Sequence, residues 1–134
     1  MYKKIIVSLA LDHGHGTRAI EVARTLRAEG GEIIAVHALE PLPGFVKNYV
    51  TTETSEKIHK MAEEGIAERI GEPKDAKAVI LVGHPGRTIT DYADKIGADL
   101  IIVGSHNPGL QDFLLGSTAA RVVRHAHCPV HVLR

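Results

Sequence analysis

The sequence has one cysteine, no tryptophan and no excess of either charge. A single thiol, Cys128, cannot form an internal disulfide, so the composition suits a reducing compartment. The 16 Lys and Arg residues equal the 16 Asp and Glu residues in number. This balance removes any general electrostatic attraction to nucleic acid or to an anionic membrane, so an anionic ligand would have to be held by local geometry.

Long hydrophobic runs are absent as well. No segment approaches the roughly 20 apolar residues that cross a bilayer. Tyr2-Lys3-Lys4 leads only into the short run Ile5-Ile6-Val7, which argues against a signal peptide. The 134 residues, 44% of them hydrophobic, are enough for one domain with a substantial core. We therefore expect a single soluble, cytoplasmic domain over residues 1–134, with neither membrane nor nucleic acid as a partner.

Short apolar runs rich in Ile and Val alternate with amphipathic segments along the chain. Several runs lack the alternation of a half-exposed strand, which is typical of parallel strands covered on both faces. Strands are predicted at Lys4–Leu9, Glu32–Ala38, Ala76–Val82, Leu100–Val103 and Val130–Leu133.

Helices are predicted between these strands, where apolar residues recur at helical spacing. The apolar positions are Ile20, Ala23 and Leu26, then Ile58, Ala62, Ile66 and Ile70, then Ile89, Ala93 and Ile96, and finally Ala119, Val122, Val123 and Ala126 after a start near Ser117. The first helix should end at Gly30-Gly31 and the third at Gly97, and Ser55 or Thr54 should cap the second. The resulting βαβαβαβαβ order predicts right-handed crossovers, helices on both sheet faces and a ligand site at the carboxyl ends of the strands.

A glycine-rich stretch follows the fourth predicted strand. That strand ends at Gly104, where the missing Cβ lets the backbone approach a ligand. Gly116 opens the last helix, followed by Ser117 and Thr118. The first N–H groups of a helix lack internal partners and carry partial positive charge, so they can hold a phosphate. Such charge-assisted hydrogen bonds, worth about 1.5–3 kcal/mol each, bring micromolar affinity within reach.

The stretch from Gly104 to Arg134 resembles the universal stress protein family, in which two spaced glycines are followed by Gly-Ser or Gly-Thr. The continuation from Ala119 to Val130 is similar to the family's last helix and strand. Gly83-His84-Pro85-Gly86 adds a weaker likeness. The resemblance implies an α/β, doubly wound, Rossmann-like fold with a five-stranded parallel sheet in the order 3-2-1-4-5. It also implies frequent homodimers, ATP binding in one branch and no strong catalytic activity.

The resemblance further implies which residues contact an adenine nucleotide. Gly104 would lie by the ribose and phosphates, the residues from Gly116 would cradle the phosphates, and Val36 would pair with adenine through its backbone. The full binding set is Ser8, Leu9, Ala10, Val36, Val103, Gly104, His106, Asn107, Gly109, Gly116, Ser117 and Thr118. Two positions depart from the family pattern: Asn107 replaces its second motif glycine, and Ala10 replaces the usual aspartate, with Asp12 two residues on.

The function that follows is a stress-associated regulatory dimer that binds ATP, ADP or AMP, with Mg²⁺ or Mn²⁺ bridging the phosphates. The final strand supports the dimer, because an apolar edge strand invites a second copy, here through Val130 and Val132. Two alternatives stay open: a dimeric interaction module without nucleotide, which Ala10 favours, and a slow ATPase. No catalytic residue or dedicated metal-ligand set is readable, so we expect at most weak ATP hydrolysis.

Two further features belong to segments expected at the ligand end of the sheet. His13 and His15, after the first strand, could contact phosphate, bind a metal or be solvated, and no neighbouring cysteine or carboxylate pair completes a zinc set. The long segment Leu39–Val50 could be a mobile lid or an ordinary surface excursion.

Overall fold

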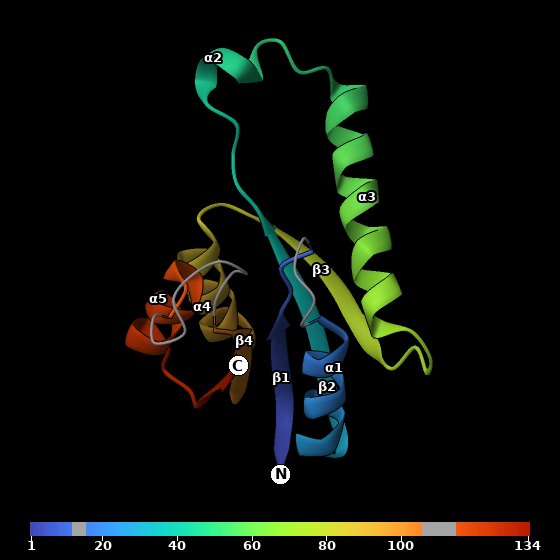
Figure 1. Cartoon of the computed structure of the whole chain (residues 1–134), viewed down its shortest axis with the longest axis vertical. Helices are drawn as coiled ribbons and strands as arrows, with labels where there is room; N and C mark the ends of the chain where they lie inside the picture. The colour runs from blue at the N-terminus through green and yellow to red at the C-terminus, as the bar shows by residue number, and fades with distance from the viewer. Residues whose placement is uncertain (12–15, 106–114) are drawn as a thin grey trace.

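The computed structural model describes residues 1–11, 16–105 and 115–134 (Figure 1). Its centre is a sheet of five parallel strands in the order β3-β2-β1-β4-β5, which confirms the predicted topology. The strands are β1 (Tyr2–Ser8), β2 (Arg27–Leu39), β3 (Ala76–Val82), β4 (Leu100–Gly104) and β5 (Val130–Leu133). The winding reverses between β1 and β4, and ligands of open α/β sheets bind at the carboxyl end of such a reversal.

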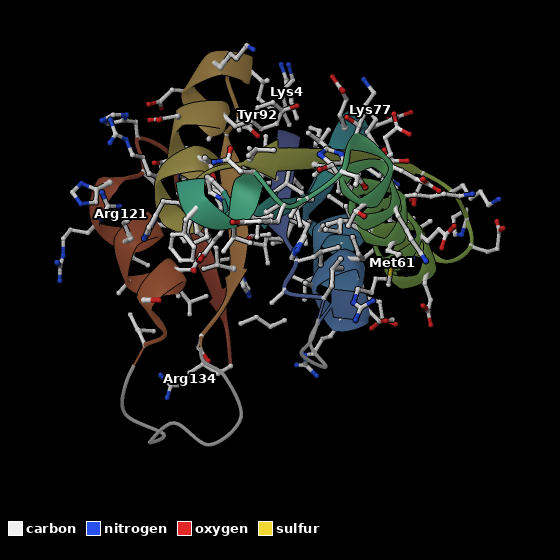
Figure 2. All side chains as sticks on the ribbon, turned by 90° about the horizontal axis from the view of Figure 1, so that it is seen from above. Lys4, Met61, Lys77, Tyr92, Arg121 and Arg134 are labelled. Carbon is white, nitrogen blue, oxygen red and sulfur yellow. The ribbon has the colours of Figure 1, made fainter. Side chains whose placement is uncertain are left out.

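Helices cover both faces of the sheet. The helices α1 (Gly16–Leu26) and α3 (Thr52–Ile70) pack on one face, and α4 (Pro85–Ile96) and α5 (Ser117–His125) pack on the other. Successive residues of β1 serve the two cores in turn, since Ile5 and Val7 face α1 and α3 while Ile6 faces α4 and α5. Seen from above, α3 with Met61 and α5 with Arg121 lie on opposite sides of the molecule (Figure 2).

The first helix ends earlier than the sequence predicted. It stops at Leu26 and β2 begins at the next residue, so Gly30 and Gly31 lie inside a strand. The pairing of β2 with β1 shifts register between Arg27 and Glu32, which places both glycines in an irregularity of the strand. Gly30 has a φ of 76°, a left-handed conformation that glycine adopts at little cost. The two glycines therefore bend β2 and do not end α1.

The other helix ends agree better with the sequence. Gly97 ends α4 with a φ of 70°, and α5 begins at Ser117, as predicted. The cap of α3 is a correction: the Thr51 hydroxyl accepts a hydrogen bond from the Thr54 N–H at 3.1 Å. The helix therefore begins at Thr52, about one turn before a cap at Thr54 or Ser55 would place its start.

Only the second half of α3 packs on the sheet. Ala62, Ile66 and Ile70 are buried as predicted, but Ile58 is 41% exposed. Figure 1 shows the first half extending past the carboxyl end of the sheet, together with the connection that carries the short helix α2 (Gly44–Lys47). Among the described residues, no helix combines the length and apolar character needed to cross a membrane.

Candidate functional site

A cavity of about 500 Å³ opens at the carboxyl ends of β1 and β4. Eight residues of the predicted binding set line it: Ser8, Leu9, Ala10, Val103, Gly104, Gly116, Ser117 and Thr118. The structure therefore brings the strand end at Gly104 and the helix start at Gly116 to one hollow, although 12 positions separate them along the sequence. The cavity lies at the reversal of the winding, where the topology predicts a ligand.

Backbone hydrogen bonds hold the two glycines in place. The Ser105 N–H donates to the Leu133 carbonyl at 2.8 Å, which continues the pairing of β4 with β5. The Gly116 N–H donates to the Ser105 carbonyl, so the start of α5 is attached to the end of β4. A Cβ added at Gly104 would meet no atom of residues 1–11, 16–105 or 115–134 within 4 Å. On the side of these described residues, the space beside Gly104 is therefore open.

Three helices begin at this cavity. Gly16 is the first residue of α1, Pro85 of α4 and Ser117 of α5, and all three line the hollow. The N-cap residues of α4 and α5, His84 and Gly116, make no side-chain capping hydrogen bond. Pro85 lacks an N–H, so α5 offers more free donors than α4. Each helix start adds partial positive charge, and together they favour an anionic group at this edge of the sheet.

The described residues that line the cavity include no Asp, Glu, Lys or Arg, and His37 is the one titratable side chain among them. Its Nδ1 lies 2.7 Å from the Leu9 carbonyl oxygen. A carbonyl only accepts, so Nδ1 carries the proton and Nε2 is left as an acceptor in the neutral ring. The wall thus combines apolar surface with helix N–H groups, serine and threonine hydroxyls and one imidazole, a set that suits an aromatic base joined to phosphate.

One predicted residue lies behind this wall. Val36 is fully buried, it is not among the lining residues, and its carbonyl accepts the Leu9 N–H at 2.8 Å. The next two residues of β2, His37 and Ala38, line the cavity instead. The signal for them was already in the sequence: the predicted strand Glu32–Ala38 ends beyond Val36, and β2 ends at Leu39.

Other lining residues lay outside the predicted set: Gly16, Ala19, Pro85, Ile89, Ala119 and Leu133. They belong to the starts of helices and to the end of β5, which meet only in the folded chain. Ala10 lines the cavity and is exposed, so a methyl group stands where the resemblance implied an aspartate. The predicted residues His106, Asn107 and Gly109, as well as Asp12, His13 and His15, lie outside the described residues.

Two further observations concern metals and the long connection. In residues 1–11, 16–105 and 115–134, no group of three or more His, Cys, Asp or Glu side chains could hold a metal ion. The described lining residues include none from 40–50, and both interpretations of the Leu39–Val50 connection, lid or surface excursion, stay predictions.

Comparisons with known proteins agree with this geometry. The model of the universal stress protein family matches residues 1–134. A universal stress protein of Thermus aquaticus is 34% identical over 140 residues, covering 100% of both chains. A universal stress protein of Methanocaldococcus jannaschii is 41% identical over 144 residues, covering 100% of this chain and 83% of the relative.

Solved structures give the same result. The structure of hypothetical protein MJ0577 has a TM-score of 0.75 at 28% identity, covering 99% of this chain and 96% of its own. A universal stress protein from Archaeoglobus fulgidus has a TM-score of 0.71 at 24% identity over 100% of both chains, and a structure of the protein from this organism contains dAMP. The family model matches the whole length, residues 1–134, and the chain belongs to the universal stress protein family.

Proposed function

We propose that this protein binds an adenine nucleotide, ATP, ADP or AMP, in the cavity between β1, β4 and the start of α5. The observation that carries the proposal is the joint lining of one hollow by Gly104, Gly116 and Ser117. In addition, proteins of the same fold are described in complex with dAMP and with cAMP, at 24% identity each. An adenine ligand also suits a wall that is apolar except for helix N–H groups and hydroxyls.

The parts of the cavity divide between the two ends of such a ligand. The first N–H groups of α5, with the Ser117 and Thr118 hydroxyls, would take the phosphates. No group of described side chains would hold a metal, so Mg²⁺ or Mn²⁺ would come with the nucleotide and would offset part of the phosphate charge. The adenine would lie between the ends of β1 and β2, against Leu9, Ala10 and Ala38. The described wall has no carboxylate that could act as a general base, so we propose that the protein binds the nucleotide without strong catalysis. We further propose that it does so in the cytoplasm and in response to stress.

Filling the cavity tests this proposal. Gly104→Val should abolish binding, because its side chain would occupy open space beside the proposed ribose and phosphates. Gly44→Val is the matched control, since a Cβ at Gly44 also meets nothing within 4 Å and Gly44 does not line the cavity. Isothermal titration with ATP and AMP, with and without Mg²⁺, should show binding by the wild type and the control only. Equal binding by both variants would place the ligand elsewhere, and no binding by the wild type would favour the interaction module without nucleotide.

We further propose that the protein is a homodimer through β5. This strand is at the edge of the sheet. The Pro129 carbonyl accepts a hydrogen bond from the Ile101 N–H of β4, and the Leu133 carbonyl accepts one from the Ser105 N–H just after β4. By alternation, the backbone groups of Val130 and Val132 point away from β4. Free edge groups of this kind pair readily with a second strand.

A further inference from the structure

Arg69, in the last turn of α3, contacts both described residues that flank 12–15. Its Nη2 donates to the carbonyl oxygen of Leu11, at the end of the segment that follows β1. Its Nη1 donates to the carbonyl of Gly65, one turn earlier in α3, at 3.1 Å. The guanidinium therefore joins the segment after β1 to a helix that is 58 positions away from Leu11 in the sequence.

The stem of the same side chain lies against the first residue of α1. A Cβ built on Gly16 would be 2.7 Å from Cδ, 3.0 Å from Cγ and 3.1 Å from Nε of Arg69. Gly16 has no side chain, and this allows the close contact. Leu11 is also held by packing, since its Cδ1 would be 3.1 Å from a Cβ on Gly65. One face of α3, made by Gly65 and Arg69, thus fixes where this part of the chain leaves the sheet and where α1 begins.

Both fixed points belong to the cavity wall or adjoin it. Leu9, Ala10 and Gly16 line the cavity, whereas Arg69 and Leu11 do not. We propose that Arg69 is a positioning residue for the nucleotide site, acting through Leu11 and Gly16 from behind the wall. This inference rests on the proposed function. The helix α3 contributes no residue to the described lining of the cavity. Its role in this inference is to hold one side of the cavity at the width that a nucleotide needs.

Arginine suits this task better than lysine. Its planar guanidinium donates in two directions from one rigid group, to Leu11 and to Gly65, while its stem packs on Gly16. A lysine keeps the charge and the stem but offers one ammonium at a single point. Partial rescue by lysine is therefore expected, and methionine should provide the stem alone.

The control for general loosening of α3 is Arg24. Its Nη2 donates to the Ile70 carbonyl at 2.9 Å and to the Pro73 carbonyl at 2.8 Å, and it pairs with Asp75. It therefore tethers the same end of α3, but neither Arg24 nor these partners line the cavity. Arg24→Met removes a comparable tether without touching Leu11 or Gly16.

The experiment is titration of wild type, Arg69→Met, Arg69→Lys and Arg24→Met with AMP and with ATP, together with thermal unfolding of each protein without ligand. We expect Arg69→Met to raise Kd about tenfold or more and Arg69→Lys to raise it less. We expect Arg24→Met to leave Kd within about twofold while lowering Tm at least as much as Arg69→Met does.

Unchanged affinity in Arg69→Met would overturn the inference and leave the proposed function standing. Equal weakening in Arg24→Met would also overturn it, because the effect would then be general. Absence of binding by the wild type would instead refute the proposed function. If Arg69→Met does not fold, the Arg69→Lys and Arg24→Met comparison decides the question alone.

Discussion

At the scale of single residues, one cluster of described charges, Asp75 with Arg24 and Arg27, contributes no residue to the lining of the candidate site. Asp75, just before β3, accepts hydrogen bonds from Arg24 at 2.8 Å and from Arg27 at 3.1 Å. The Arg24 hydrogen bond is the largest cause that holds the pKa of Asp75 below its ordinary value of 3.8, and burial opposes it. This cluster ties α1, β2 and the end of α3 together. None of these three charged side chains lines the candidate site.

Asp75→Asn should lower the free energy of unfolding by about 1–2 kcal/mol at neutral pH, since it removes charge-assisted hydrogen bonds that are partly exposed. The folded pKa is depressed, so the contribution of the carboxylate is present in full above its ordinary value and is lost as pH falls through the folded value. Urea unfolding of both proteins from pH 7 to pH 3 measures this. The difference should stay constant down to about pH 5 and shrink below it, and a difference that grows on acidification would contradict the assignment.

At the scale of the elements, Gly97 and Gly104 differ in what a side chain would cost the protein: only Gly97 has a backbone conformation that favours glycine. Gly97 ends α4 with a φ of 70°, and a Cβ there would meet no atom within 4 Å. Gly104 also has open space, without a positive φ. Neither position has a steric contact among the described residues, so a comparison of the two isolates the effect of backbone strain.

Gly97→Ala should destabilise the fold by about 1 kcal/mol, because an L side chain is strained in the left-handed conformation. Gly104→Ala should change stability by less than about half as much, because the added methyl group meets neither strain nor contact. Chemical denaturation of the two variants beside the wild type provides the measurement. Equal losses would show that strain at the end of α4 is not the cause.

The sequence predicted the regular elements well where apolar side chains define them. The runs of Ile and Val located β1, β3, β4 and β5 within a residue or two, and the order of the strands followed from the alternation of strands and helices. It did not show the first part of β2, from Arg27, because that part is polar and is held by Asp75, which is distant in the sequence. The helix α2 is too short to produce a periodic pattern.

In the candidate site too, residues marked by a local sequence pattern were predicted, and residues brought together by distant contacts were not. Glycine, serine and threonine at the end of a strand and the start of a helix marked Gly104 and Gly116 to Thr118 in advance, and all of them line the cavity. His37 and Ala38 lie inside the predicted strand Glu32–Ala38 but were missed, because the resemblance implied Val36 as the residue of this strand that contacts the ligand. Arg69 could not be found at all, since no local pattern connects it to Leu11 and Gly16.

At the scale of the whole molecule, the two edges of the sheet differ. β3 forms one edge and β5 the other. The short strand β5 carries the half-buried Val130 and Val132, whereas β3 ends in Val82, which is 59% exposed. Pairing through β5 would place two cavities in one assembly, related by a two-fold axis.

The dimer proposal predicts a solution mass of twice the monomer at micromolar concentration. Val132→Pro should yield a folded monomer, because it removes an outward N–H from an edge strand without breaking the pairing of β5 with β4. Sedimentation velocity with circular dichroism as a check on folding is the measurement. Val82→Thr, on the opposite edge, is the control and should stay dimeric. A wild type that sediments as a monomer at all concentrations would end the proposal.

The first half of α3 carries no buried side chain between Thr52 and Met61. Polar substitutions at these positions are therefore expected to leave the packed core and the sheet unchanged. The stretch is also a convenient handle for the experimenter. A fluorophore attached near Lys57 or Lys60 would report on events at the surface without disturbing the packed interior.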